Sequence, residues 1–281
     1  MPLQCRWNDN VVSPYDATSK VYKCKNNQYK CKNTNKFFNV KTGTLFESSN
    51  IDLTKWFEAI YYMTSNKKGF AALKLKKDIN VTFKTAWFML QRIRNCFNIN
   101  MEQLEGIVEV DETYIGGKSR NRHKNKYEKG TQGRSTKHKT AVFGAVERGG
   151  NVIAKVVPNT QSKTLMPLIE QHIKQNTQIM SDEWIAYSSI NKYKKWVHSY
   201  IKHSQGEYVS GDVYTNTIES VWAILKRGFI GVYYVMSRKH LQRYIDEFVF
   251  RYNTRNYTEN DRFCCFFRNM KNRLKWKDLV A

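Results

Sequence analysis

The chain has 281 residues, of which 41% are hydrophobic and 25% charged, so it can bury a core and is neither disordered nor fibrous. Its 47 Lys and Arg residues against 24 Asp and Glu give a net charge of +23, which is more than solubility requires. Such a charge indicates a polyanionic partner, and nucleic acid is the first candidate. No apolar run approaches the roughly 20 residues that cross a bilayer, and residues 1–10 lack the apolar stretch of a signal peptide, so we expect an intracellular protein with no membrane contact and reduced cysteines.

Residues 1–48 predict a small β-rich module. Lys36–Val40 is a short strand-like piece before a turn at Lys41–Gly43. A structural zinc ion needs four Cys or His ligands in two close pairs, whereas six residues separate Cys24 from Cys31 and no His occurs in the first hundred positions. We therefore expect no structural zinc; a zinc site is the alternative.

Residues 49–104 predict three helices. The first begins after Asp52, and the second runs from Phe70 to about Lys77, beyond a break at Gly69. The first helix has one apolar stripe, formed by Trp56, Ile60 and Met63. Three closely spaced helices in a basic segment favour a helix-turn-helix that binds DNA.

The third predicted helix lies within residues 81–97, and its expected buried face is formed by Phe83, Trp87, Leu90 and Phe97. Side chains off that face are expected to contact DNA, namely Lys84, Gln91, Arg92 and Arg94. In a helix-turn-helix the last helix enters the major groove and its basic residues contact phosphate. The alternative that periodicity leaves open is an ordinary three-helix packing unit with a solvated basic face.

Residues 105–281 predict an α/β domain. Asp111 follows the apolar run Ile107–Val110 and is expected on a central strand, where a charge is costly to bury unless it is paired or bound to metal. Asp111 is therefore a candidate functional residue. After it, the sequence predicts a hairpin over Thr140–Val157 and a helix from Ser162 to about Lys174.

Two further acidic residues complete a candidate site. Asp182 ends a second central strand, and Glu219 lies on a helix expected over Thr215–Arg227, with Lys226 two turns away on nearly the same face. With Asp111, they form a set of carboxylates that can hold two Mg²⁺ (or Mn²⁺) ions for in-line phosphoryl transfer. For any one of them alone, a helix cap or a surface ion pair is the alternative.

The stretch from Gly116 to Lys139 is strongly basic, with nine Lys and Arg residues against the single acid Glu128. We expect it to contact DNA phosphates beside Asp111. The residues assigned to this contact are Lys118, Arg120 and Arg122. A solvated loop that the domain tolerates is the alternative.

Three segments carry a resemblance to a known family: VEVDETYIGGK, SDEWIAYSS and NTIESVWAILKRG. They closely resemble the DDE transposases of the Merlin superfamily and their bacterial insertion-sequence relatives, and the similarity runs from about Arg6 to about Asn256. The resemblance implies an RNase H-like mixed sheet with flanking helices, and cut-and-paste transposition at terminal inverted repeats. The implied metal ligands are Asp111, Asp182 and Glu219, and Lys226 resembles the basic residue that contacts the element's end, with Arg227 beside it. The implied partners are double-stranded DNA, both repeats and target, and further copies of the chain on that DNA.

Several positions depart from the family's pattern. Relatives carry a CPxC pair where this chain has Ser13–Asp16, and their second pair survives as Cys31 with Thr34 in place of its partner, which makes residues 1–48 a degenerate zinc-ribbon-like module. A His common before the Asn-Thr-Ile-Glu motif is Tyr214 here. The rival functions are a domesticated, non-catalytic DNA-binding protein and a nuclease of RNase H-like fold. The expected location follows the host: cytoplasm or nucleoid in a bacterium, nucleus in a eukaryote.

Overall fold

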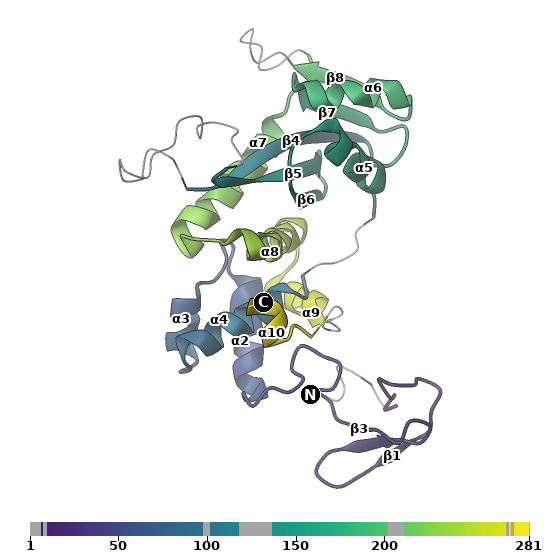
Figure 1. Ribbon diagram of the computed structural model, residues 1–281, viewed down its shortest axis with the longest axis vertical. Helices are drawn as coiled ribbons and strands as arrows, with labels where there is room; N and C mark the ends of the chain where they lie inside the picture. The colour runs from purple at the N-terminus through teal and green to yellow at the C-terminus, as the bar shows by residue number, and fades with distance from the viewer. Residues whose placement is uncertain are drawn as a thin grey trace. The chain divides into compact units, whose positions relative to one another are not determined.

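The computed structural model describes Trp7 and residues 10–97, 102–117, 137–201, 211–267, 270 and 273–280. The chain divides into two compact units, which are coloured by residue number in Figure 1. The helical unit consists of Met1–Asn66, Phe70–Phe97 and Tyr257–Ala281, and the sheet unit consists of Lys67–Gly69 and Asn98–Asn256. The three predicted functional domains, with boundaries after residues 48 and 104, stay a prediction. No helix within the described ranges is long and apolar enough to cross a membrane.

The helical unit begins with a three-stranded antiparallel sheet in the order β1-β2-β3. Its strands are short: β1 is Val21–Lys23, β2 is Tyr29–Cys31 and β3 is Phe37–Phe38. Tyr29, Cys31 and Phe38 form a small core on which Trp7 packs edge-on. Aromatic packing thus supports a β-rich module of the kind predicted for this region.

Hydroxyl groups surround the one cysteine in this core. Burial raises the pKa of the Cys31 thiol, but hydrogen bonds from Ser13, Ser19 and Thr34 outweigh it and bring the pKa from 9.0 to about 6. Ser13 and Thr34 occupy positions at which relatives are expected to carry zinc ligands. The hydroxyls here stabilise a thiolate through hydrogen bonds.

The depressed pKa of Cys31 predicts that the local stability of this module depends on pH. Because the thiolate is favoured in the folded state, its contribution is fully present above pH 9 and is lost as pH falls through about 6. Hydrogen exchange of the Cys31 amide, which donates to the Lys36 carbonyl at 3.0 Å, should report this loss after correction for intrinsic exchange rates. Cys31→Ser should remove the dependence and Cys24→Ser should keep it; equal pH profiles in wild type and Cys31→Ser would contradict the assignment.

Five helices of the helical unit have bounds within the described residues. They are α2 (Leu53–Ser65), α3 (Ala72–Asp78), α4 (Phe83–Arg94), α9 (Glu259–Phe267) and α10 (Trp276–Val280). Asp52 caps α2 by accepting from the Thr54 amide at 2.7 Å, and the predicted stripe of Trp56, Ile60 and Met63 is buried. The helices predicted from residue 52 onwards therefore exist, with α3 beginning two residues later than expected.

Leu90 and Phe97 are buried as predicted, but the rest of the predicted orientation of α4 is wrong. Its buried residues include Ala86, Met89 and Ile93, whereas Phe83 is 48% exposed. Gln91, Arg92 and Arg94, expected to lie on an exposed face, are all buried, and of the four predicted DNA contacts on this helix Lys84 alone is exposed. Aromatic residues lie on both sides of this helix, so a period of 3.6 residues fits two faces and does not choose between them.

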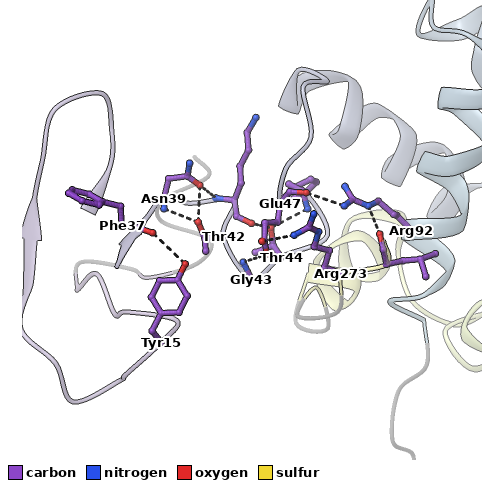
Figure 2. Close-up of polar contacts among 12 residues, drawn as sticks. Tyr15, Phe37, Asn39, Thr42, Gly43, Thr44, Glu47, Arg92 and Arg273 are labelled. Atoms are coloured by element: carbon purple, nitrogen blue, oxygen red, sulfur yellow. Dashed lines mark hydrogen bonds and ion pairs between the residues drawn. The ribbon is translucent and has the colours of Figure 1, made fainter. Parts of the chain in front are cut away.

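The buried arginines bind backbone carbonyls within the helical unit. Arg92 donates from Nε to the carbonyl of Leu274 at 2.9 Å and from Nη2 to the carbonyl of Glu47 at 3.0 Å (Figure 2). The carboxylate of Glu47 accepts from Arg273 at 2.7 Å and from the Gly43 amide at 2.9 Å. A guanidinium whose N–H groups are hydrogen-bonded can be buried. The positive charge of Arg92 was therefore not enough to identify the exposed face of α4.

The sheet unit contains a five-stranded mixed sheet in the order β6-β5-β4-β7-β8. The strands are β4 (Ile107–Gly116), β5 (Lys139–Glu147), β6 (Val152–Val157), β7 (Gln178–Asp182) and β8 (Val197–Ile201). β4, β5 and β6 pair antiparallel, whereas β7 runs parallel to β4 and to β8. The central position of β4 and the hairpin after it confirm both predictions.

Helices cover both faces of this sheet, which confirms the predicted mixed sheet with flanking helices (Figure 1). One face carries α5 (Ser162–His172), η3 (Ile185–Ser189) and α6 (Ile190–Tyr193). The other carries α7 (Asn216–Gly228), followed by η5 (Phe229–Tyr233), η6 (Arg238–His240) and α8 (Leu241–Asn253). Alternate residues of β4 face the two cores, with Val108 and Val110 on the α5 side and Ile115 on the α7 side.

Candidate active site

Asp111 and Asp182 lie on neighbouring parallel strands in matching register. β4 and β7 pair Glu109 with Met180, so two residues further on Asp111 is level with Asp182. Side chains at equal level in parallel strands point to the same face, and such strands are about 4.8 Å apart. Continued for two residues beyond its last pair, Glu109 with Met180, the register would bring the two carboxylates side by side at the carboxyl ends of central strands, where α/β sheets bind their ligands.

The surroundings of these carboxylates are negative and partly fixed. The Trp184 amide donates to Oδ1 of Asp182 at 3.0 Å. Burial, followed by the negative charges of Glu112, Asp111 and Asp182, raises the pKa of Tyr187 well above its usual value. All three carboxylates therefore contribute negative potential at the position of this one buried phenol.

Helix α7 brings Glu219 to the same face as Asp111. Trp222 on α7 donates from Nε1 to Oδ2 of Asp111 at 3.1 Å. Glu219 is three residues before Trp222, and residues three apart are neighbours on a helix surface. The predicted stripe of Ile218, Val221, Trp222 and Leu225 is buried, and Glu219 beside it is exposed. The helix therefore packs on the sheet through its stripe, with Glu219 exposed one turn before the residue that contacts Asp111.

A glycine on β5 makes room for this helix. Gly144 pairs with Asp111, and a Cβ at this position would lie 2.3 Å from two ring carbons of Trp222 and 3.3 Å from Ile218. No heavy side chain fits between the sheet and α7 here. The absence of a side chain at Gly144 thus sets how closely α7 approaches Asp111.

Gly144→Ala should displace α7 and destabilise the sheet unit by about 1–3 kcal/mol, as overpacking of a core does. Urea denaturation followed by tryptophan fluorescence measures this change. Gly117→Ala is the matched control, because nothing lies within 4 Å of a Cβ there. Equal stabilities of the two variants would contradict the close approach of Trp222.

The start of α7 is held by a buried carboxylate that sequence reasoning missed. Glu109 is fully buried, and its carboxylate accepts from the Thr217 hydroxyl at 2.8 Å and from the Ile218 amide at 3.0 Å. Arg148, in the turn between β5 and β6, donates to it from Nε at 2.8 Å. Glu109 thus satisfies an amide of the first turn of α7, one residue before Glu219.

Arg148 extends this anchor to the segment before the helix. Its other nitrogens donate to the carbonyls of Asp212 at 2.9 Å and Tyr214 at 3.0 Å, and its guanidinium lies 3.5 Å from the centre of the Tyr214 ring. The signal that could have found Glu109 is alternation, because it precedes Asp111 by two residues and must share its face. Nothing in the sequence of the turn Arg148–Gly150 identifies Arg148 as its partner.

Carboxylates of this kind suit a hard divalent cation. Among the residues that the structure describes, no three His, Cys, Asp or Glu side chains converge as the ligands of a single ion would. Two ions about 4 Å apart do not require that convergence, because one carboxylate can be shared by both ions while each of the two flanking carboxylates serves only one of them. The assignment of Asp111, Asp182 and Glu219 as the ligands of such a pair of ions stays a prediction.

Other predicted contacts are placed as follows. Lys226 and Arg227 are exposed on the last turn of α7. Lys118, Arg120 and Arg122 lie outside the described residues, as does His203. His198 lies on β8, where burial lowers its pKa and its Nε2 contacts the Ser181 hydroxyl at 2.9 Å. Tyr187 and Trp222 are buried, so neither offers a free ring face on which a base could stack.

A family model described as an ISXO2-like transposase domain matches residues 103–253 of the chain. An uncharacterized protein in transposable element ISH50 of Halobacterium salinarum is 31% identical over 269 residues, covering 88% of this chain and 87% of the relative. An uncharacterized transposase-like protein of Haemophilus influenzae is 28% identical over 102 residues, covering 36% of this chain and 80% of the relative.

Two solved structures show a weaker similarity to the chain. The pre-cleavage Mos1 transpososome matches with a TM-score of 0.32 at 10% identity, covering 80% of this chain and 78% of the other. The simian T-cell lymphotropic virus intasome matches with a TM-score of 0.32 at 14% identity, covering 62% and 63%. A TM-score of 0.32 is too low to establish a common fold.

Proposed function

The chain belongs to the ISXO2-like transposase family, and we propose that it cuts DNA strands at the terminal inverted repeats of its own element and joins them to target DNA. Membership confirms the resemblance to insertion-sequence transposases. The observation that most supports this chemistry is the hydrogen bond from Trp222 to Asp111, which connects Asp111 to the helix that carries Glu219. The β4–β7 register, continued two residues beyond Glu109 and Met180, adds the expectation that Asp182 lies beside Asp111. The order of the five strands supports an RNase H-like fold for the sheet unit.

Asp111 takes the role of the shared ligand, with Asp182 and Glu219 on either side of it. Two Mg²⁺ or Mn²⁺ ions, when bound, supply charge stabilisation at the attacking and leaving oxygens of an in-line phosphoryl transfer. The chain's own contribution is position. Trp184 orients the Asp182 carboxylate, Trp222 orients that of Asp111, and Glu109 fixes the start of the helix that bears Glu219.

Basic residues supply the contacts to double-stranded DNA. Lys226 and Arg227 are two turns along α7 from Glu219, about 11 Å at 1.5 Å per residue, and reach the phosphates next to the cut. Lys118, Arg120 and Arg122 add contacts from the basic stretch after β4. In the helical unit, Lys84 is the exposed basic residue of α4, and α2 to α4 act as the helix-turn-helix. The active species is a homo-oligomer on DNA.

A strand-transfer assay tests this function. A labelled duplex that carries the element's own end is incubated with a plasmid and with Mg²⁺, Mn²⁺ or EDTA, and both nicking and joining are scored. Metal-dependent nicking followed by joining is the expected result. Nicking without joining would indicate a nuclease, and tight binding with neither reaction in folded protein would indicate a non-catalytic DNA-binding protein.

A further inference from the structure

An apolar turn projects from the sheet unit directly after α7. η5 (Phe229–Tyr233) is a π-helical turn, and Tyr234 follows with φ 57° and ψ −45°. Ile230 is 62% exposed, Tyr234 74% and Val235 77%, and we call these three residues the apolar tip. π-helical turns and left-handed backbone at a non-glycine residue are both unfavourable, and they recur at functional sites.

The apolar tip stands on an anchored base. The Tyr233 hydroxyl donates to the buried Glu247 carboxylate at 2.6 Å, and its ring packs edge-on against Tyr244 at 4.9 Å. The Tyr234 amide donates to the Phe229 carbonyl at 2.8 Å, and Phe229 and Met236 pack on the core under α7 and α8. The exposed side chains are therefore presented by a fixed turn, which reduces the entropy lost when a partner binds.

The base is also closely packed on its other side. A Cβ at Gly69 would meet the Tyr233 hydroxyl at 1.8 Å, and one at Gly228 would lie 3.2 Å from the Lys68 carbonyl. Only glycine lets this segment approach so closely. The turn is thus supported from two directions within the sheet unit.

The charge around the apolar tip has one sign. No acidic residue occurs between Glu219 and Asp246. The stretch contains five Lys and Arg residues: Lys226, Arg227, Arg238, Lys239 and Arg243. All but Arg243 are exposed. A polyanion complements such a surface, whereas a second copy that met it with the same surface would bring like charges together.

We propose that the apolar tip is a wedge that enters the DNA duplex beside the cleavage site and unstacks a base step. The proposal rests on the function proposed above. Apolar side chains inserted between base pairs unstack them and kink the duplex, while flanking basic residues hold the phosphates. Ile230 is eleven residues beyond Glu219, about 16 Å along the helix axis, which corresponds to about five base pairs at 3.4 Å each.

Such a wedge would make the phosphate near Glu219 easier to reach, because unstacking a few base pairs away loosens the duplex at the cut. The wedge also predicts how a mismatch in the duplex affects cleavage. A mismatch about five base pairs from the cut removes part of the cost of unstacking in advance. It should therefore increase the activity of a protein that lacks the apolar tip more than that of the wild type.

The test places the fluorescent base 2-aminopurine at successive positions three to eight pairs from the cleavage point of the terminal-repeat duplex, with Ca²⁺ in place of Mg²⁺ to hold the bound state. The full-length wild type should raise the fluorescence several-fold at one or two adjacent positions. The triple variant Ile230→Ser, Tyr234→Ser, Val235→Ser should give no rise and bind about 10- to 100-fold more weakly. The triple variant should cleave the mismatched duplex at least tenfold faster than the matched duplex.

Val197→Ser is the matched control, because Val197 is 60% exposed on β8, outside the apolar tip. It should behave as the wild type, and circular dichroism should show all proteins folded. Binding and cleavage by the wild type without a fluorescence rise at any position would overturn the wedge and leave the transposase function standing. A triple variant that keeps the fluorescence rise but loses self-association in sedimentation would also overturn it, because the apolar tip would then be a subunit interface. A wild type that neither binds nor cuts would refute the proposed function itself.

Discussion

Asp111→Asn is expected to lower strand cleavage and joining by about a thousandfold or more. The change keeps the shape of the side chain and its hydrogen bond from Trp222, but removes the charge that two ions would share. A bound metal ion contributes several kcal/mol of charge stabilisation in the transition state, and about 4 kcal/mol corresponds to a thousandfold in rate. Asp182→Asn and Glu219→Gln should cause losses of similar size.

The measurement is single-turnover nicking and strand transfer over a range of Mn²⁺ concentrations. Glu183→Gln is the matched control, since Glu183 is exposed directly after Asp182 and has no role as a ligand in the proposal. It should stay within about twofold of the wild type, as expected when no interaction specific to the transition state is removed. If Asp111→Asn is no slower than Glu183→Gln, Asp111 is not a metal ligand. DNA binding in Ca²⁺ should survive in all four variants, which separates lost chemistry from lost folding.

Glu109→Ala should have the largest effect on stability. Removing one partner of a buried ion pair costs about 3–5 kcal/mol, because the other charge stays uncompensated. For a unit of this size that loss corresponds to a fall in Tm of roughly 10 °C. Glu109 is fully buried, and Arg148 beside it is only 16% exposed, so solvent screens the pair poorly.

Calorimetry and chemical denaturation measure this effect, with Glu105→Ala as the control. Glu105 pairs with Lys174 at 2.6 Å on the surface, where the side chains are 60% and 62% exposed, so its loss should cost less than about 1 kcal/mol. The double variant Glu109→Ala, Arg148→Ala should recover part of the loss, because no buried charge is left unpaired. A Glu109→Ala protein as stable as Glu105→Ala would show that the anchor of α7 is not the buried pair.

Sequence patterns located the strands and helices of the candidate site because each pattern there has one solution. Apolar residues on both sides of Asp111 require a central strand, and the stripe through Trp222 fits a single face of α7. The same reasoning failed for α4, since aromatic residues lie on both of its sides and the donors of Arg92 are hydrogen-bonded to carbonyls of distant residues, Leu274 and Glu47. Long-range partners of this kind leave no trace in local periodicity.

The same limit explains why the anchor of α7 and the apolar tip were missed. Arg148 reaches Glu109 only because the β4–β5–β6 register brings the turn back over the start of α7. Ile230 and Val235 look like core residues by composition, and only the π-helical turn exposes them. The roles proposed for Lys118, Arg120 and Arg122 and the division into three functional domains stay predictions.

The interrupted path of the chain through the helical unit has a consequence for its synthesis. Helix α9 packs on α2 through the Phe57–Phe267 ring contact, the Tyr61–Glu259 hydrogen bond and the bond from Arg262 to the Thr64 carbonyl. A nascent chain therefore emerges from the ribosome with α2 complete but its partner unmade. At 5–20 residues per second, the intervening sheet unit delays that partner by roughly 10–30 s. During this interval the sheet unit can fold alone. The aromatic face of α2 lacks its partner until residue 267 has been made, so it is exposed to solvent or covered by a chaperone.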